Sequence, residues 1–362
     1  MNDTSMNDIS VAHVVQKVGG YSIPVEIAGA ISERAEVDGG LISIRDLPAP
    51  QDRPDIINSE TVLEACSPVR SYRRLVEELE EKEYDIVHTH HNRSAVRVAW
   101  SCRGRSLVHF NTQHGHLHYS APQKALNLVT LLLTKRFSYN SKTTKESYSW
   151  FENILRAGGF HRVIHNGVDL DRLEPFQKVE YGPLRTLVTA SRLIRRKNIS
   201  VVLEALKSLP RLGFIIVGEG PLRQDLQTKA RQMGVTEQVE FVGFVQDRED
   251  VYRILSQGDA FVHPSFSEGF CVAVAEAMAL GLPVIVSDIP VFHEVVGDEG
   301  LFVNPTDPQS LERTLKWLIN HPQEGEKRGL QNRHRIQAHF DLDDIASEYV
   351  ETYRSVLQSK EE

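Results

Sequence analysis

Short apolar runs alternate with stretches of helical spacing along the chain, and this alternation predicts repeated strand–turn–helix units. In the first half we expect strands at 11–16, 41–44, 85–88, 106–110, 136–140 and 163–165. In the second half we expect them at 186–190, 213–217, 239–242, 260–263, 283–287 and 301–303. The expected helices include 23–34, 69–83, 199–208 and 345–357. Strands that alternate with helices form parallel sheets covered on both faces, so the pattern predicts an α/β fold of two doubly wound halves.

The two series are separated by the turn Asn166-Gly167 and by a segment from Asp169 to Pro183 that is dotted with prolines and charges. A length of 362 residues also exceeds what one hydrophobic core usually serves. We therefore expect four parts: an N-terminal Rossmann-like domain over 1–170, a linker over 171–183, a C-terminal Rossmann-like domain over 184–342 and a final helical segment over 343–362.

The composition is that of an ordinary globular protein, with 41% hydrophobic and 25% charged residues. Cys66, Cys102 and Cys271 are too widely spaced for a disulfide framework or a Cys-x-x-Cys pair. Residues 1–10 lack the apolar core of a signal peptide, so we expect a cytoplasmic protein. The apolar stretch 125–133 is too short to span a membrane, and 271–286 contains a glutamate and a Gly-Leu-Pro break. We expect both stretches to be buried elements.

Charge is unevenly distributed along the chain. The formal net charge is −8, yet residues 86–165 hold eleven lysines and arginines against Glu146 and Glu152. A basic zone on an acidic protein favours an anionic partner, such as a phosphate-bearing substrate or a membrane surface, over duplex nucleic acid. A solvated surface without a partner is the alternative. Peripheral membrane contact through the N-terminal domain is thus an expectation from charge.

Two carboxylates flank an expected loop-to-helix junction. We expect Gly269 to permit backbone geometry that a side chain would forbid, and the apolar run after it has helical spacing. The free N–H groups at a helix start can receive an anion, while Glu268 and Glu276 can accept hydrogen bonds from sugar hydroxyls. Acids at this position can also simply complement the helix dipole. Glu276, however, lies in an otherwise apolar stretch, where an unpaired charge would be costly.

Open α/β sheets bind ligands at the carboxyl ends of their strands. The residues that fall just after expected strands are Gly19, Gly20, His88, His114, Arg192, Gly218 and Glu268. Arg192 offers a planar fork suited to phosphate oxygens, and Lys197 offers a mobile point charge. Together they can neutralise a departing diphosphate. The alternative for this pair is a basic, solvated loop.

These segments together resemble the retaining GT-B glycosyltransferases of glycosyltransferase family 4, and the resemblance covers nearly the whole chain. The residues that carry it are Asp85-Ile86-Val87-His88-Thr89-His90, Asn111-Thr112-Gln113-His114-Gly115, Val163-Ile164-His165-Asn166-Gly167-Val168-Asp169, Arg192 with Lys197, Val217-Gly218-Glu219-Gly220-Pro221, and Glu268 with Glu276. The resemblance implies two facing Rossmann-like domains and a final helix that packs back on the N-terminal one.

What the resemblance implies for function is transfer of a sugar from a nucleotide-sugar, UDP- or GDP-linked, to a glycan, lipid-linked or small-molecule hydroxyl. It places Arg192 and Lys197 on the diphosphate, Glu276 on the ribose and Glu268 on the transferred sugar. Further donor contacts would come from the C-terminal domain's Gly218, Val245, Gly269, Phe270 and Cys271, and from the Gly19-Gly20 loop. His114 would lie close to the reacting sugar. The anomeric configuration would be retained without a protein base, cofactor or obligatory metal.

Two departures from the family pattern and several rival interpretations stay open. Ser191 stands where such proteins often carry glycine, and the Gly19-Gly20 loop is short. The rivals are a sugar-nucleotide epimerase, a phosphorylase and a non-catalytic subunit with the same fold. A dinucleotide dehydrogenase is disfavoured because no Gly-x-Gly-x-x-Gly follows the first strand. The alternating histidines, 114, 116 and 118 or 88, 90 and 91, could also be read as zinc ligands, which we do not expect.

Overall fold

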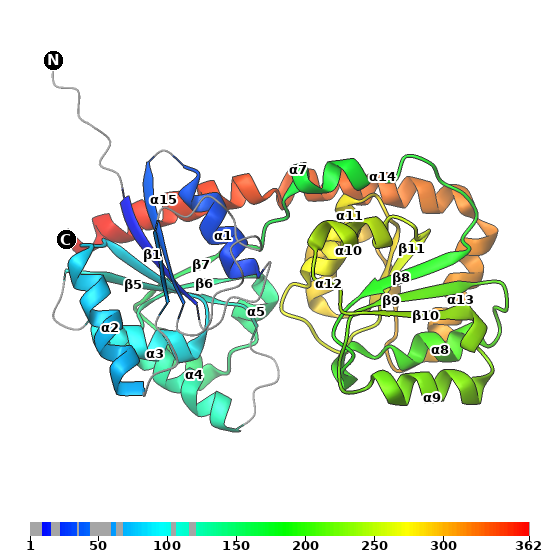
Figure 1. Ribbon diagram of the computed structural model, residues 1–362, viewed down its shortest axis with the longest axis horizontal. Helices are drawn as coiled ribbons and strands as arrows, with labels where there is room; N and C mark the ends of the chain where they lie inside the picture. Colours follow the sequence, from blue (N-terminus) through cyan, green and yellow to red (C-terminus); the bar gives the residue numbers. More distant parts are fainter. Residues whose placement is uncertain are drawn as a thin grey trace, which may run out of the picture. The chain divides into compact units, whose positions relative to one another are not determined.

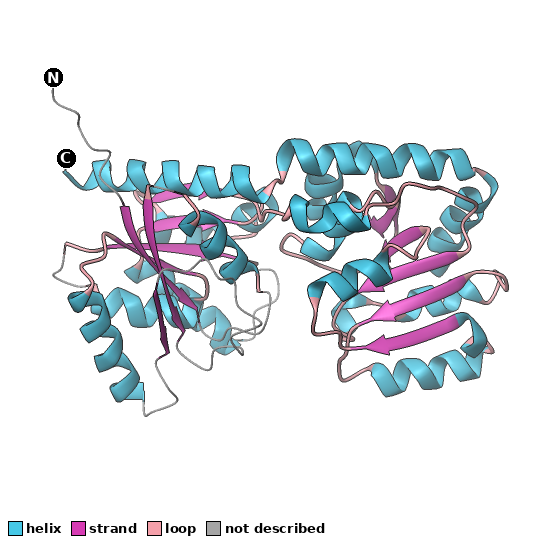
Figure 2. Ribbon diagram, turned by 45° about the horizontal axis from the view of Figure 1, so that its top comes forward, coloured by secondary structure: helices cyan, strands magenta, loops and turns pink. Residues whose placement is uncertain are grey.

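The computed structural model describes residues 9–15, 22–34, 36–43, 59–62, 68–102, 106–115 and 121–361 (Figures 1 and 2). The chain divides into two compact units. The first comprises Met1–Gly167 together with Leu342–Glu362, and the second comprises Val168–Asp341. Each unit is built on one parallel sheet flanked by helices, as the alternating pattern predicts.

The sheet of the first unit has seven parallel strands in the order β3-β2-β1-β4-β5-β6-β7. In chain order these are β1 (Ile9–Val15), β2 (Val37–Ser43), β3 (Ser59–Val62), β4 (Ile86–Thr89), β5 (Val108–Gln113), β6 (Arg136–Tyr139) and β7 (Phe160–Val163). The edge strand β3 has no counterpart among the expected strands. The order reverses beside β1, whose neighbours are β2 on one side and β4 on the other.

Helices cover both faces of this sheet (Figure 1). On one face, α1 (Ile23–Ser32) and α15 (Leu342–Glu361) pack on β1, β4 and β5, with Tyr349 and Tyr353 fully buried against Phe110. On the other face, α2 (Pro68–Glu81) and α3 (Asn92–Ser101) pack on Ala12, Val14 and Val87. The chain continues through α4 (Ala121–Leu133), α5 (Lys142–Glu146) and α6 (Trp150–Arg156). The final helix of the chain therefore belongs to the first unit's core.

The second unit has six parallel strands in the order β10-β9-β8-β11-β12-β13. They are β8 (Thr186–Ala190), β9 (Gly213–Val217), β10 (Val239–Gly243), β11 (Ala260–His263), β12 (Val284–Ser287) and β13 (Leu301–Val303). The order reverses at β8, which pairs with β9 on one side and β11 on the other. A ligand crevice is expected at the carboxyl ends of strands at such a reversal.

The helices of the second unit are α7 (Leu170–Leu173), α8 (Ser200–Leu206), α9 (Arg223–Met233), α10 (Arg248–Leu255), α11 (Val272–Ala279), α12 (Pro290–Val296), α13 (Pro308–Asn320) and α14 (Pro322–His339). Leu187, Phe214 and Ile216 of the sheet form one core with residues of α8 and α13. β11 and β12 are buried at every position, which explains why they read as continuous apolar runs.

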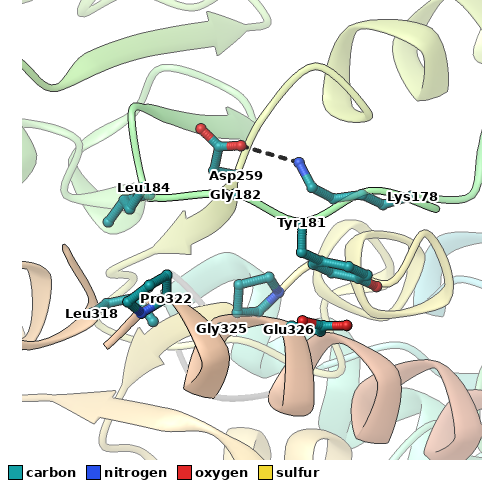
Figure 3. Close-up of a pocket in the computed structure, with 10 residues that line it drawn as sticks. Lys178, Tyr181, Gly182, Leu184, Asp259, Leu318, Pro322, Gly325 and Glu326 are labelled. Atoms are coloured by element: carbon teal, nitrogen blue, oxygen red, sulfur yellow. Dashed lines mark hydrogen bonds and ion pairs between the residues drawn. The ribbon is translucent and has the colours of Figure 1, made fainter. Parts of the chain in front are cut away.

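The expected linker over 171–183 is not a free segment, and this is a correction. The chain passes from one unit to the other at Gly167 and Val168 and returns at Asp341 and Leu342. Lys178 Nζ lies 3.1 Å from Asp259 Oδ1 (Figure 3). It also lies 2.7 Å from Gly258 O. Tyr181 donates to Gly281 O at 3.0 Å, and Arg333 donates to Lys178 O at 2.7 Å. Polar side chains thus fasten the segment to the second unit, which its proline and charge content did not indicate.

The two apolar stretches also differ from each other. Residues 271–286 form α11 and β12 and are buried almost throughout, as expected. Residues 125–133 lie in α4, where Leu131 is buried but Val129 and Leu132 are exposed, so the expectation of a buried element is wrong for the outward side of the helix. In the part of the chain that the structure describes, no helix combines the length and the apolarity needed to cross a membrane.

Candidate functional site

The candidate site of the second unit lies at the carboxyl ends of β8 and β11. After β8, residues Arg195–Lys197 form a 3-10 turn, and Asn198 ends it in the left-handed conformation with φ of 53°. The Asn198 amide holds this turn by donating to Pro264 O at 3.2 Å and to Pro305 O at 2.7 Å. The loop after β11 pairs with it, because Phe266 N donates to Arg196 O at 2.9 Å. The two loops therefore present their side chains to each other.

Glu268 is the centre of a charged network in this loop pair. Its carboxylate is only 6% exposed, and it accepts from Lys197 Nζ at 2.7 Å and from Arg196 Nη1 at 2.8 Å. Arg196 also donates to Ser267 O at 2.6 Å. Burial by itself would raise the pKa of Glu268, but the hydrogen bond from His263 and the charges of Lys197 and Arg196 hold that pKa well below its ordinary value. The carboxylate is therefore ionised and acts only as an acceptor.

His263, the last residue of β11, supports the same network. Its Nε2 lies 3.2 Å from Glu268 Oε1 and 3.2 Å from Lys197 Nζ. Burial, followed by the charge of Lys197, lowers the pKa of His263, so the ring is neutral. Since Glu268 cannot donate, Nε2 carries the proton and donates to it. Sequence reasoning missed both His263 and Arg196, although the first ends an expected strand and the second adjoins Lys197.

Arg192 and Glu276 lie apart from this network. Arg192 is exposed two residues beyond the end of β8. Glu276 is 3% exposed in α11, and its partners come from α10: Arg248 forms an ion pair with it, and Tyr252 donates to it at 3.1 Å. The expectation that a buried Glu276 needs a partner is thus met by Arg248 and Tyr252, neither of which the sequence had indicated.

Gly218 and its neighbours join the loops after β8 and β9. Gly218 has φ of +127°, and an added Cβ would lie 2.0 Å from Ser191 O. Its N–H donates to Gly243 O at 2.7 Å, while Leu193 N donates to Glu219 O at 2.9 Å. Only glycine fits this position without a shift of the backbone. The structure accordingly places Gly218 at the same edge of the sheet as Arg192.

The start of α11 departs from one expectation. Gly269 is not among the residues with positive φ, whereas Cys271, which precedes the helix, has φ of 74°. A non-glycine residue in this region marks local strain. Phe270 is 1% exposed and packs edge-on against Phe340, so only its backbone is available to a ligand.

Burial, followed by the charge of Glu268, raises the pKa of the Cys271 thiol to about 12, which excludes it as a nucleophile. Val245 is half-buried in the loop between β10 and α10.

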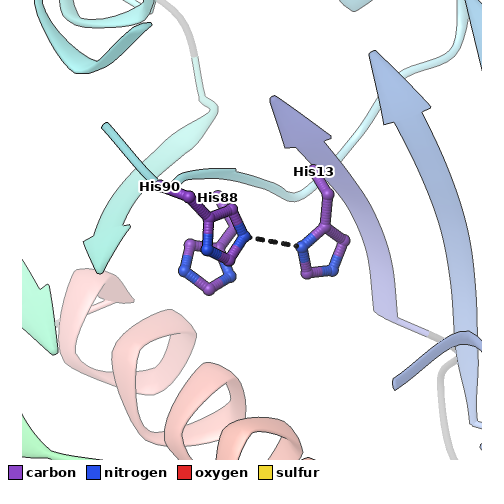
Figure 4. Close-up of side chains that lie close together, drawn as sticks. All are labelled: His13, His88 and His90. Atoms are coloured by element: carbon purple, nitrogen blue, oxygen red, sulfur yellow. Dashed lines mark hydrogen bonds between the residues drawn. The ribbon is translucent and has the colours of Figure 1, made fainter. Parts of the chain in front are cut away.

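His114 belongs to the first unit, where it follows β5. Its Nε2 lies 3.3 Å from His90 Nδ1, and His90 Nε2 lies 3.3 Å from His13 Nδ1 (Figure 4). Burial lowers the pKa of both His114 and His13 to about 3, so these rings are neutral. The contacts run from His13 through His90 to His114, one ring to the next. The chain fixes the orientation of His114.

His88 lies beside this chain but has other partners, the Tyr353 hydroxyl and Thr112 Oγ1, each at 2.6 Å. Ligand atoms of His13, His88 and His90 fall within 4.8 Å of one another, close enough to share an ion. Hydrogen bonds engage both ring nitrogens of His88 and of His90 and Nδ1 of His13, and a dication here would be fully buried among neutral groups, which is unfavourable. We assign no metal to them. His13 and His88 lie opposite each other on the adjacent strands β1 and β4. Both residues are visible in the sequence, but their proximity could be recognised only once the strand order was known.

Gly19 and Gly20 lie outside the described residues, as do His116 and His118. The pocket lined by Lys178, Tyr181 and Glu326 in Figure 3 contains none of the expected site residues. The structure therefore brings together Lys197, Glu268 and Cys271, places Arg192, Gly218 and Glu276 on the loops and helix around them, and sets His114 in a histidine chain of the other unit.

Comparison with known proteins agrees with this arrangement. The family model for glycosyl transferases group 1 matches residues 171–335, and the model for glycosyltransferase family 4 matches 48–172. The putative glycosyltransferase EpsD of Bacillus subtilis is 27% identical over 288 residues, 72% of this chain and 74% of that protein. Two Escherichia coli relatives are the O-antigen biosynthesis glycosyltransferase WclY, 28% identical over 59% of this chain, and a UDP-Gal:alpha-D-GlcNAc-diphosphoundecaprenol alpha-1,3-galactosyltransferase, 30% identical over 61%. The chain spans 60% of the first and 62% of the second.

Among solved structures, HepE of Anabaena in complex with UDP and glucose superposes with a TM-score of 0.79 at 19% identity, over 96% of this chain and all of that one. Sucrose-phosphate synthase of Thermosynechococcus elongatus gives 0.78 at 18% identity, over 97% of this chain and all of that one. These likenesses establish the GT-B fold. Because the two family models together span 48–335, the chain belongs to the group 1 and family 4 glycosyltransferases.

Proposed function

We propose that this protein transfers a sugar from a nucleotide-sugar to an acceptor hydroxyl with retention of the anomeric configuration. The observation that carries the proposal is the pairing of Lys197 and Arg196 with the ionised Glu268 at the strand ends where the sheet order reverses. Cations and an acceptor-only carboxylate at one edge suit a ligand with a diphosphate and a polyol.

In this proposal each side chain has a distinct task. Lys197 and the exposed Arg192 neutralise the diphosphate as it leaves, and Glu268 accepts hydrogen bonds from hydroxyls of the transferred sugar. Glu276 accepts from the ribose, with Arg248 balancing its charge. The backbone of Gly269, Phe270 and Cys271 and the turn at Val245 line the donor. The ion pairs of Glu268 hold Lys197 in place before the donor binds, which lowers the cost of ordering it.

Retention without a protein base agrees with the state of His114. A ring with its pKa lowered to about 3 is a poor proton acceptor at neutral pH. The leaving phosphate would take the acceptor's proton instead. We propose further that turnover requires no metal ion, and expect it to persist in the presence of EDTA.

For the donor, a UDP-sugar has more support than a GDP-sugar. HepE binds UDP and UDP-glucose, and one Escherichia coli relative is named for UDP-galactose and a diphosphoundecaprenol-linked acceptor. We therefore propose a UDP-sugar donor and a sugar or lipid-linked sugar as acceptor.

The test is product analysis with a panel of UDP- and GDP-sugars. Thermal shift first identifies the donor, because a ligand at 100 times its dissociation constant stabilises a protein by about 2.7 kcal/mol. Incubation with lipid-linked and free glycan acceptors, followed by NMR of the new anomeric proton, then determines the linkage. Transfer with inversion would refute the mechanism. Epimerised donor without any acceptor, or phosphorolysis, would refute transfer as the activity.

A further inference from the structure

Exposed apolar side chains gather on three helices of the first unit. Among the described residues, six of the ten exposed large hydrophobic side chains lie on α3, α4 and α6. We call these six the apolar patch: Trp100 (54% exposed), Val129 (40%), Leu132 (55%), Trp150 (74%), Phe151 (49%) and Ile154 (56%). α4 packs against both α3 and α6, so the helices that carry the patch adjoin one another. Patches of this kind usually mark interaction surfaces.

The helices beneath the patch are locked together by buried polar side chains. Asn92 of α3 donates to Asn127 of α4 at 3.2 Å, and Asn127 donates to Glu152 of α6 at 3.0 Å. Glu152 also accepts from the backbone and the hydroxyl of Ser149, at 2.9 and 2.8 Å, in a capping box. This chain of hydrogen bonds fixes the relative positions of the three helices.

Two of these helices depart from the usual amphipathic arrangement, because polar side chains share their inner faces with the apolar Leu131 and Leu155. α4 buries Asn127 and Thr130 while it exposes Val129 and Leu132. α6 buries Glu152 while it exposes Trp150 and its neighbours. A surface helix normally turns polar side chains outward, so exposed tryptophan, phenylalanine and aliphatic side chains on α4 and α6 indicate a partner that covers them.

The segment 86–165, which carries the apolar patch, is basic. Arg93 on α3, Lys124 on α4, and Lys135 and Lys142 on the flanking loop and helix are exposed. Of the two acids in residues 86–165, Glu152 is buried and hydrogen bonded, which leaves Glu146 as the exposed one. The surface thus combines two tryptophans, aliphatic side chains and lysines.

We propose that the apolar patch and its lysines dock this protein on an anionic lipid bilayer. Tryptophan rings settle at the boundary between headgroups and acyl chains, and aliphatic side chains enter just below them. Lysines and arginines at the rim meet the negative headgroups. A second copy of the chain suits the patch less well, because a symmetric pair would bring two basic surfaces together. The docking does not depend on the proposed transferase activity.

The first measurement is cosedimentation of the whole protein with vesicles of phosphatidylcholine plus phosphatidylglycerol, against phosphatidylcholine alone. We expect binding to the anionic vesicles that weakens as salt is raised. Absence of binding at low salt would overturn the proposal. Binding that does not distinguish the two compositions would overturn the role of the lysines.

Matched variants locate the contact. Lys124→Glu and Lys142→Glu are each expected to lower the partition coefficient about fivefold or more, since a basic residue near a charged membrane contributes about 1 kcal/mol. Trp150→Ser and Leu132→Ser are expected to lower it as well, because each removes apolar surface that enters the bilayer. The controls lie in the second unit: Val179→Ser for an exposed apolar residue and Lys207→Glu for an exposed lysine. An equal decrease of the partition coefficient in the controls and in the patch variants would contradict the assignment of membrane contact to the apolar patch.

Tryptophan fluorescence gives an independent readout. Two of the three tryptophans, Trp100 and Trp150, lie in the patch, while Trp317 lies in α13 of the second unit. Brominated lipids are expected to quench the wild type and the Trp317→Phe variant alike, and the Trp150→Phe variant much less. Unquenched protein on vesicles would show that another surface binds. Concentration-dependent dimers that Leu132→Ser abolishes would instead make the patch a self-interface.

Discussion

Lys197 is the residue on which the proposed chemistry depends most. Lys197→Ala is expected to lower kcat/KM about 10²- to 10³-fold, the usual effect of losing one group that stabilises developing charge. The fold should survive, because Arg196 and His263 still pair with Glu268. Steady-state kinetics with the identified donor measure the effect, with Lys207→Ala, an exposed lysine of the same unit, as the control. Turnover equal to the wild type would remove Lys197 from the mechanism.

Glu276 is expected to act on binding more than on turnover. Glu276→Gln keeps the shape of the side chain but removes its charge, so a ribose hydroxyl loses a charge-assisted bond worth about 1.5–3 kcal/mol. We expect the dissociation constant of the nucleotide to rise about 10- to 100-fold, measured by calorimetry. Glu249→Gln, an exposed acid on α10, is the control. An unchanged dissociation constant would contradict the ribose assignment.

The ionised carboxylate of Glu268 raises the free energy of unfolding over a defined pH range. Its pKa is lowered in the folded state, so its contribution is present above the unfolded pKa, about 4.3, and is lost as pH falls through the lowered value. The difference in unfolding free energy between wild type and Glu268→Gln should stay constant from about pH 7 to 5 and shrink below about pH 4. Chemical denaturation at several pH values checks this, and a difference that grows on acidification would refute it.

At the scale of elements, the loops after β8 and β9 depend on one glycine. Gly218→Ala would place Cβ against Ser191 O at φ of +127°, so we expect a loss of about 2–3 kcal/mol of unfolding free energy. Gly213→Ala, at the other end of β9, meets only ordinary contacts and should cost less than about 1 kcal/mol. Urea denaturation compares the two. Equal costs would mean that the close approach of the loops is not required.

The same scale shows what the pattern of the sequence predicted well and what it did not. Strand positions in the second unit follow the expected runs closely, because strands buried on both faces are continuously apolar. The edge strand β3 was missed, and the exposed side of α4 was expected to be buried. A strand at an edge needs little apolar content, and α4 is apolar on the side that its core does not cover.

At the scale of the whole molecule, the two units are expected to respond differently to acid. The first unit buries His13, His88, His90 and His109, with burial lowering the pKa of His13 and His109 to about 3, and the second buries His263. Histidines in the unfolded chain bind protons below about pH 6.5, whereas the buried rings of the folded state do not. The free energy of unfolding therefore falls as pH falls, by about 1.4 kcal/mol per pH unit for each such ring.

We therefore expect acid to unfold the first unit before the second. Hydrogen exchange with mass spectrometry between about pH 7 and 5, expressed as protection factors, should show protection lost first in β1, β4 and β5. His109→Gln and His13→Asn should reduce the difference between the pH values at which the two units lose protection. Simultaneous loss of protection in both, or earlier loss in the second unit, would refute the prediction.

The sequence by itself determined the family and the two parallel sheets and supplied candidate site residues, because apolar periodicity and the motifs at strand ends are local properties of the chain. Lys197, Glu268 and Glu276 could be named in this way. Only the tertiary structure decided which side chains complete the site: Arg196 and His263 around Glu268, Arg248 and Tyr252 beside Glu276, and the histidine chain of His114. Those partners come from elements up to 77 residues apart in the chain, as His13 and His90 are, and strand order brings them together, which no local pattern encodes.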